Sequence, residues 1–348
     1  MNTAEYIEHR GEEEANEILC SVFGEKFRAY RRQWERASNF EVVTDYPMFL
    51  VLEAAYSCNL RCIHCVHGYD DLKAQWAYAH TMERPLYERV IDEAAAHGCP
   101  SLSLNNINEP LLSRELVDQI RYASAKGIMD IMINTNGVLL TERITERLLD
   151  SGLTRLLVSF DAASKETYTK VRVGGNYDKV LANVERFLEM RARRNLKVPV
   201  LRASMVRLSV NEHEVKDFVQ QWSDKADYLA IQEFAAPEPN RAEFERLFAG
   251  SRMVLGEFRC PQPWQRLVVQ GDGAVLPCCS QFAQELKLGD ARETPVRDIW
   301  RSPRMDRMRE LHRRGRYADN RTCARCVSTW VGTRPSSPNA QGGAACAS

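Results

Sequence analysis

The sequence predicts an α/β fold in which a parallel sheet is covered by helices. Between residues 49 and 235, short runs rich in β-branched and aromatic residues alternate with amphipathic segments. Six β/α units in succession indicate parallel strands joined by helical crossovers. The runs that predict strands are Phe49–Ala55, Ser101–Leu104, Met129–Asn134, Thr154–Phe160, Pro199–Val206 and Asp227–Phe234.

The segments between these runs have the periodicity of helices with one apolar face. Functional sites in such folds lie at the carboxyl ends of the strands. Polar segments that directly follow a strand are therefore the first candidates for the site. The predicted helices are Leu86–His97, Arg114–Lys126, Glu142–Asp150, Tyr177–Arg194 and His213–Ser223.

Composition narrows the class of protein. Lys+Arg and Asp+Glu both number 47 in 348 residues, so no bulk charge favours nucleic acid or a membrane surface. The chain has no apolar run long enough to span a membrane, and its acidic N-terminus is unlike a signal peptide. Eleven cysteines in such a chain indicate metal ligation in a reducing cytoplasm.

The same patterns divide the chain into four regions. Residues 1–48 have helical spacing and predict an N-terminal helical cap, on whose apolar face Cys20 is an inert thiol. Residues 49–235 form the α/β domain, and residues 236–330 form a smaller cysteine-containing domain. Residues 331–348 have the Gly/Pro/Ser composition of a disordered tail.

Three cysteines follow the first predicted strand at C-x3-C-x2-C spacing: Cys58, Cys62 and Cys65. Thiolates on one short loop are the usual ligands of an iron–sulfur cluster, and three ligands for four irons leave one iron open. With His64 and His67 nearby, a structural zinc site is the alternative, although its usual paired spacings differ. A disulfide framework is less consistent with a long chain without a secretory leader.

With this loop, in which His64 fills a position that is usually aromatic, the chain resembles the radical S-adenosylmethionine (SAM) superfamily. The resemblance implies a partial (β/α)6 TIM barrel and a [4Fe–4S] cluster on the three cysteines, whose open iron binds SAM. It also implies that one electron, from an external donor such as flavodoxin or ferredoxin, cleaves SAM. The products are methionine and a 5′-deoxyadenosyl radical, which abstracts hydrogen from substrate.

The resemblance extends to polar segments after the next three strands. Glu109 matches the glutamate of a Gly-Gly-Glu-Pro segment that accepts from the SAM ammonium, although both glycines are replaced. Asn134 and Asn136 lie in a Thr-Asn-Gly turn near the SAM ribose, and Ser159 and Asp161 in a Ser-x-Asp segment. Asp161 has the alternative of capping the following helix, and the asparagines before Glu109 replace backbone contacts or reach substrate.

Charged residues on the last two predicted strands suggest the substrate side of the site. Arg202 and Glu233 are costly to bury on apolar strands without a partner, so we expect them to be catalytic. An ordinary salt bridge is the alternative interpretation.

The C-terminal region contains a second cysteine set. Cys260, Cys278, Cys323 and Cys326 surround a predicted hairpin, Arg266–Gln270 and Ala274–Leu276, and would saturate a second [4Fe–4S] cluster. They resemble the auxiliary-cluster domain called SPASM, in the shortened, single-cluster form called twitch that occurs in aminocyclitol-modifying members. A zinc ribbon is the alternative. Cys279 is extra, and we expect it to pack or to donate a hydrogen atom.

These inferences predict a radical SAM oxidoreductase that dehydrogenates or epimerises a hydroxylated small molecule, a sugar or an aminocyclitol, in antibiotic or other natural-product biosynthesis. Two alternatives are open. One is modification of a ribosomal peptide, which the helical N-terminal region disfavours. The other is a non-catalytic iron–sulfur or zinc scaffold, which metal analysis would distinguish.

Overall fold

The structure, a computed structural model, describes residues 5–7, 11–53, 56–74, 81–238, 241–249 and 258–330. The predicted tail, residues 331–348, lies outside the described residues. The predicted parallel sheet is confirmed, and the strands form one ten-stranded sheet in the order β1-β7-β6-β5-β4-β3-β2-β8-β9-β10. Within it, β2 to β7 and β8 run parallel, and β1, β9 and β10 pair antiparallel with their neighbours.

The strands are short and mostly buried, as expected when helices cover a parallel sheet. The first five are β1 Glu5–Ile7, β2 Phe49–Glu53, β3 Ser101–Ser103, β4 Asp130–Thr135 and β5 Arg155–Ser159. The others are β6 Val200–Arg207, β7 Tyr228–Glu233, β8 Arg266–Gln270, β9 Ala274–Leu276 and β10 Gly289–Asp290.

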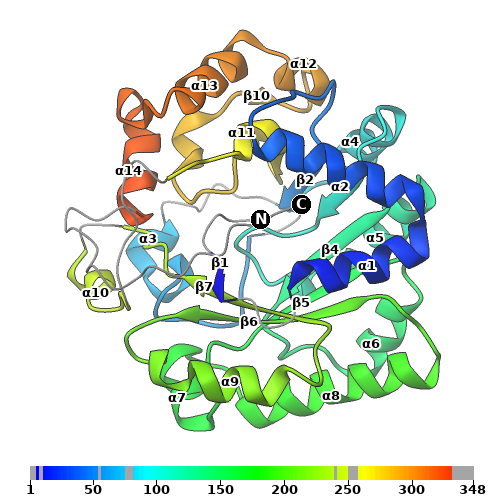
Figure 1. Ribbon diagram of the computed structural model, residues 1–348, viewed down its shortest axis with the longest axis vertical. Coiled ribbons are helices and arrows are strands. Elements are labelled where there is room, and N and C mark those ends of the chain that lie inside the picture. Colours follow the sequence, from blue (N-terminus) through cyan, green and yellow to red (C-terminus); the bar gives the residue numbers. More distant parts are fainter. Residues whose placement is uncertain are drawn as a thin grey trace, which may run out of the picture.

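The helices that follow the strands pack their apolar faces against the sheet (Figure 1). Those up to β7 are α1 Glu12–Phe23, α2 Glu25–Ser38, α3 Asp70–Ala74, α4 Arg84–Ala96, α5 Leu116–Ala125, α6 Glu142–Leu149, α7 Lys165–Val171, α8 Tyr177–Arg193 and α9 Val215–Trp222. Those after β7 are α10 Ala242–Glu245, α11 Gln262–Gln265, α12 Val296–Trp300, α13 Pro303–Arg313 and α14 Arg321–Trp330. None of the described helices combines the length and apolarity needed to cross a bilayer.

Two elements differ from the sequence prediction. Strand β1 lies in a region predicted to be helical, and it pairs with the edge of β7. Helix α7 was not predicted, because a helix of seven residues shows too little periodicity. Its N-cap signal is nevertheless present, since the Ser164 side chain accepts a hydrogen bond from the amide of Thr167.

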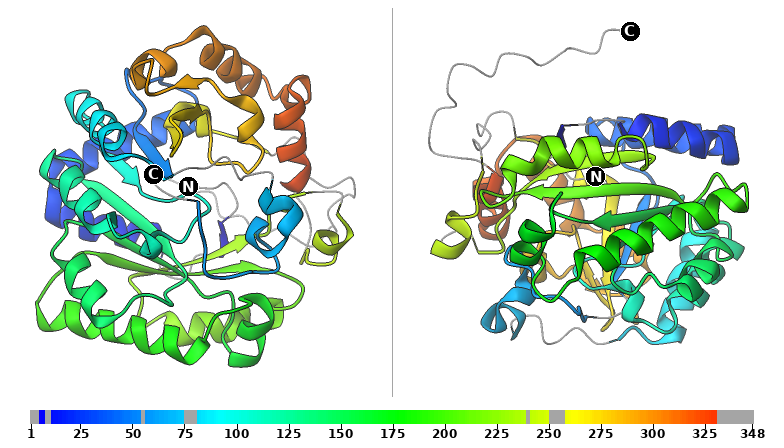
Figure 2. Two further views of the ribbon diagram at one scale, coloured as in Figure 1. Left: turned by 180° about the vertical axis from the view of Figure 1, so that it is seen from behind. Right: turned by 90° about the horizontal axis from the view of Figure 1, so that it is seen from below.

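Helices α1 and α2 lie on the opposite side of the molecule from α4 and α5 (Figure 2). Leu19, Phe27 and Trp34 of these N-terminal helices form one apolar cluster with Phe49 of β2 and Trp264 of α11. The N-terminal helices therefore join the α/β sheet to the C-terminal region.

The C-terminal hairpin extends the sheet. Strands β8 and β9 have the predicted bounds, but β8 also pairs in parallel with β2, with Phe49 opposite Arg266 and Glu53 opposite Gln270. The second cysteine set is consequently attached to the edge of the main sheet. Sequence periodicity could not predict this pairing because it joins segments more than 200 residues apart.

A buried ion pair lies where β4 and β5 begin. The Arg155 Nε donates to the Asp130 carboxylate at 2.7 Å, and both side chains are at most 2% exposed. We expect Asp130→Asn to lower the free energy of unfolding by about 3–5 kcal/mol, because it leaves a buried guanidinium without its counter-ion. Denaturant titration measures this, and Asp118→Asn in an exposed pair with Arg121 should cost less than about 1 kcal/mol. Equal losses in the two variants would contradict the expectation.

Candidate active site

The loop after β2 brings the first three cysteines together. Its backbone is held by the C-terminal end of α7 and the residues just after it, since Arg61 N donates to Val173 O at 2.9 Å and Ile63 N to Val171 O at 3.2 Å. The following turn packs closely as well: a Cβ at Gly68 would lie 2.5 Å from the Cys62 carbonyl oxygen. The loop is therefore fixed by backbone contacts on both sides.

The three thiols are close enough to influence one another's ionisation. Burial raises the pKa of Cys65 to about 12, and the neighbouring Cys62 contributes to the increase. Burial also raises the pKa values of Cys58 and Cys62. Buried thiols become thiolates when bound iron supplies positive charge, so this donor set fits an iron–sulfur cluster.

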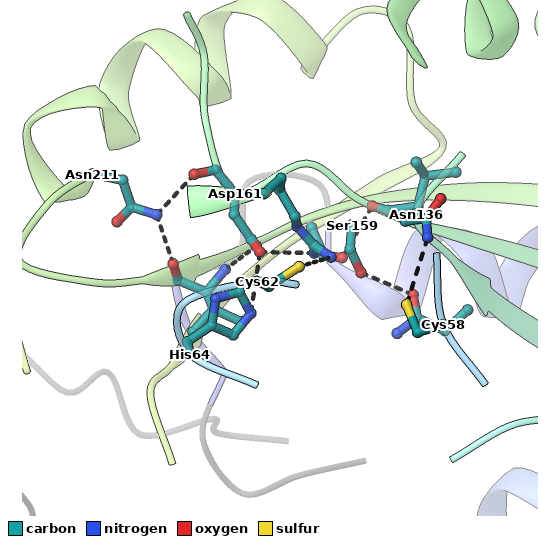
Figure 3. Close-up of polar contacts among 12 residues, drawn as sticks. Cys58, Cys62, His64, Asn136, Ser159, Asp161 and Asn211 are labelled. Carbon is teal, nitrogen blue, oxygen red and sulfur yellow. Dashed lines mark hydrogen bonds and ion pairs between the residues drawn. The ribbon is translucent and has the colours of Figure 1, made fainter. Parts of the chain in front are cut away.

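Two of the predicted SAM-binding residues, Glu109 and Asn136, are hydrogen-bonded beside this loop, and Figure 3 shows Asn136 next to Cys58. The buried Glu109 carboxylate accepts from Thr135 Oγ1 and from the Asn136 amide, both at 2.7 Å. The Asn136 side chain in turn donates to Asn59 Oδ1 at 2.8 Å, next to Cys58. Burial raises the pKa of Glu109.

The same part of the sheet contains Ser159 and Asn134, whose side chains hydrogen-bond at 3.1 Å. Asn105 makes two bonds to the Asn134 backbone, donating to its carbonyl at 3.0 Å and accepting from its amide at 2.8 Å. Of the two roles considered for these asparagines, Asn105 therefore replaces backbone contacts. Asn106 instead borders the interior cavities described below.

Asp161 is the centre of a second buried network (Figure 3). Its carboxylate pairs with Arg172 Nη2 at 2.7 Å and accepts from the Val206 amide at 2.8 Å. Arg172 Nη1 also lies 3.6 Å from Cys62 Sγ. Because Ser164 caps α7, the helix-capping alternative for Asp161 is wrong, and its carboxylate instead orients the Arg172 guanidinium toward Cys62.

Sequence reasoning missed Arg172 and Asn211 in this network. Asn211 Nδ2 donates to the Asp161 carbonyl at 2.9 Å, which fixes the backbone at a residue with a φ of 58°. The one sequence signal for Arg172 was the pair Gly174-Gly175 that follows it. A Cβ at Gly175 would lie 2.7 Å from the Tyr168 hydroxyl oxygen, so this loop folds back tightly.

The three predicted catalytic residues border one cavity of about 360 Å³, termed the upper cavity. It is also bordered by His64 and Cys65 of the first cysteine loop and by Cys326 of the second set. Glu233 pairs with Arg207 at 2.5 Å, which is the salt-bridge alternative considered from the sequence, and burial raises its pKa. Cys279 Sγ contacts Gln262 Oε1 at 3.3 Å and faces the same space.

The four cysteines of the second set line a cavity of about 30 Å³. Burial raises the pKa of Cys323 to about 12, with a further contribution from Cys326. His312 lies between two of them, with Nδ1 3.2 Å from the Cys260 carbonyl and Nε2 3.4 Å from Cys323 Sγ. Among the described residues, no three His, Cys, Asp or Glu side chains converge as ligands of a single ion. These thiols instead surround a space, which fits a cluster ligand set.

Glu53, at the end of β2, is a buried carboxyl group not singled out by the sequence. Burial raises its pKa from 4.5 to about 7, although the carboxylate accepts from the Ile107 amide at 3.1 Å. Below about pH 4.5 the carboxyl is neutral in the folded and unfolded states. Above about pH 7 it is charged in both, so the folded state alone bears the burial cost. The contribution of Glu53 to the free energy of unfolding therefore falls as the pH rises from about 4.5 to about 7.

We expect Glu53→Gln to raise the unfolding temperature at pH 8 and to have little effect near pH 5. The shift corresponds to at most about 3 kcal/mol at the higher pH. Thermal unfolding measured between pH 5 and 8 checks this, with Glu17→Gln on the exposed side of α1 as the control. A stabilisation that is the same at every pH would argue against burial of a charged Glu53.

Comparison with known families agrees with this arrangement. Residues 52–221 match the Radical SAM superfamily, and residues 260–327 match the iron–sulfur cluster-binding SPASM domain. The first match contains the Cys58–Cys65 loop and the second contains all four cysteines of the C-terminal set. The predicted cofactors, SAM and iron–sulfur clusters, are those of these families.

Curated relatives are similar over part of the chain. An AdoMet-dependent heme synthase from Methanosarcina barkeri is 34% identical over 41% of this chain and 40% of its own length. A probable GTP 3′,8-cyclase from Methanococcus maripaludis strain C5 is 31% identical over 38% of this chain and 43% of its own. The chain thus spans about two fifths of the length of these relatives.

Solved structures share the fold. BtrN, in complex with AdoMet and 2-DOIA, has a TM-score of 0.55 and 17% identity, over 80% of this chain and 92% of its own. Streptococcus suis SuiB bound to precursor peptide SuiA has a TM-score of 0.58 and 15% identity, over 88% of this chain and 74% of its own.

Proposed function

Since the chain belongs to the radical SAM superfamily and carries a SPASM domain, we propose that it dehydrogenates or epimerises a hydroxylated small molecule, a sugar or an aminocyclitol. The upper cavity carries this proposal, because Cys65 of the first set and Cys326 of the second both border it. A substrate there lies between the two cysteine sets. The fold similarity to BtrN, whose crystal structure contains 2-DOIA, supports the choice of substrate.

Cys58, Cys62 and Cys65 would hold the SAM-binding cluster, and Cys260, Cys278, Cys323 and Cys326 would hold the auxiliary one. With cluster and SAM bound, the site would supply the radical chemistry that removes a hydrogen atom from a substrate carbon. Glu109, Asn134, Asn136 and Ser159 would orient SAM, and Asp161 would act through Arg172. A flavodoxin or ferredoxin in the cytoplasm would supply the electron.

Dehydrogenation and epimerisation would use different residues of the upper cavity. Dehydrogenation removes a proton and an electron after the hydrogen atom, and Glu233 is the proposed proton acceptor. An auxiliary cluster on the set that includes Cys326, which borders the same cavity, would accept the electron. Epimerisation instead returns a hydrogen atom to carbon, for which the Cys279 thiol is the proposed donor. Arg202 would position the substrate hydroxyl groups.

An anaerobic assay tests the proposal. Reconstituted enzyme, dithionite and SAM are incubated with sugars and aminocyclitols deuterated at carbon, and the products are weighed by mass spectrometry. We expect deuterium in 5′-deoxyadenosine, together with either an oxidised product that has lost this deuterium and one further hydrogen or an epimer in which hydrogen replaces the deuterium. Cys279→Ala should abolish the isomer and spare the oxidised product. Cleavage of SAM without deuterium transfer from any of these compounds would contradict the proposal.

A second candidate is modification of a ribosomal peptide, which the fold similarity to peptide-bound SuiB favours. The same assay with a peptide library distinguishes it. Deuterium transfer from a peptide Cα or Cβ, and from none of the small molecules, would favour this second candidate.

A further inference from the structure

A second cavity, of about 190 Å³ and termed the lower cavity, adjoins the upper one. Both are bordered by Asn106, Asn134, Arg202, Gln232 and Cys279, so the two cavities adjoin along these side chains. The lower cavity is bordered by the first residues of β2, β3, β4, β5, β7 and β8 and by residues of α1 and α2. A ligand that reacts in the upper cavity can therefore extend downward toward the N-terminal helices.

The described lining of the lower cavity contains more arginines than carboxylates. Its two acidic residues already have cationic partners there: Asp130 pairs with Arg155 at 2.7 Å, and Glu12 with Arg31 at 3.4 Å. Arg202 and Arg266 also line the cavity. The described lining of the lower cavity thus has an excess of positive charge.

Arg266 forms no ion pair with a carboxylate of the described residues. It is 4% exposed, and its Nη2 donates to Gln265 Oε1 at 3.2 Å while Nη1 lies 3.7 Å from Cys279 Sγ. Its guanidinium stacks on the rings of Phe49 and Trp34, at 5.0 and 5.6 Å, and its Nε has no hydrogen-bond partner. A buried cation with only neutral partners is costly unless an anion completes its environment.

We propose that the substrate carries an anionic group, a carboxylate or a phosphate, that Arg266 binds in the lower cavity while the reacting carbon lies in the upper one. This inference rests on the proposed function and narrows it. Sugar acids and sugar phosphates fit the charge of the interior, whereas a cationic aminocyclitol would meet excess like charge. The planar guanidinium is suited to either anion, because it offers paired N–H donors.

Binding measurements test the proposal on the anaerobically reconstituted enzyme with SAM. Isothermal titration compares D-glucuronate, D-glucose 6-phosphate and D-glucose, which share a sugar ring and differ in charge. We expect at least one anion to bind about tenfold or more tightly than glucose, as a charge-assisted hydrogen bond provides. The anion with the larger preference distinguishes carboxylate from phosphate.

Variants locate the preference at Arg266. Arg266→Met should remove the preference for the anionic sugar. Arg266→Lys should retain part of this preference because it keeps the positive charge, whereas a role in packing alone would not depend on charge. Arg259→Met is the matched control, because Arg259 stacks on Phe40 and is exposed outside the cavity. Equal affinity of the unmodified enzyme for the three sugars, including no binding of any, overturns the proposal. A preference for an anion that survives in Arg266→Met also overturns it. Deuterium transfer from a neutral sugar would still leave the proposed hydrogen abstraction intact.

Discussion

Replacing Cys62 with alanine is expected to abolish reductive cleavage of SAM. Cys62 is the most buried of the three loop cysteines, and its sulfur faces Arg172. With two thiols remaining, the loop no longer supplies the three ligands that hold a cubane with one open iron. We expect 5′-deoxyadenosine formation to fall more than about 100-fold, beyond the loss typical of changes around a metal ligand. Iron should decrease from about eight atoms per chain to about four.

Cys99→Ala is the matched control for this experiment. Cys99 is also a buried thiol in the α/β domain, but it contacts the Ser101 carbonyl and lies away from the loop. It should retain both iron and SAM cleavage. Turnover that persists in Cys62→Ala would refute the assignment of the loop as the cluster site.

The second large effect is expected from Cys323→Ala, and it should separate two steps of the reaction. The variant removes one ligand of the C-terminal set, next to His312, and leaves the first loop unchanged. We expect SAM cleavage to continue, because it depends on the first cluster. The oxidised product should decrease by at least about tenfold, because the substrate electron loses its acceptor.

Three quantities check this expectation in one sample: iron content, 5′-deoxyadenosine and product mass. Cys20→Ala is the control for loss of a cysteine as such, because Cys20 is a partly buried residue of α1. If the enzyme is an epimerase, the isomeric product should persist in Cys323→Ala, since no net electron leaves the substrate. Undiminished formation of an oxidised product would rule out the auxiliary cluster as the electron acceptor.

The main sheet could be predicted from the sequence because its strands are short runs rich in apolar and β-branched residues that alternate with helical segments. Residues 200–205 are buried on both faces of the sheet, so a run such as Val200–Arg207 is recognisable without knowledge of its neighbours. The first cysteine set could be singled out because its three cysteines are close in sequence on one loop, and the second because a Cys-x2-Cys pair accompanies cysteines on either side of a predicted hairpin. The predicted strand ends were less accurate and the short helix α7 was not predicted, because tertiary contacts determine both.

The charged partners of the site could not be predicted in the same way. Arg172 reaches Cys62 only because the chain after α7 pairs with the cysteine loop, a contact across 110 residues. Arg266 was predicted only as the first residue of a hairpin, and the pairing of β8 with β2 brings it inside the sheet. Both roles arise from contacts between distant segments, which residue spacing does not encode.

The pairing of β8 with β2 also bears on how this enzyme can be engineered. A fragment ending before Arg266 would leave the backbone N–H and C=O groups of β2 as an open sheet edge, and such edges promote self-association. Grafting a different C-terminal module onto this barrel would therefore succeed only if the donor brings its own edge strand in the same register. The α/β domain and the C-terminal region are therefore best exchanged together.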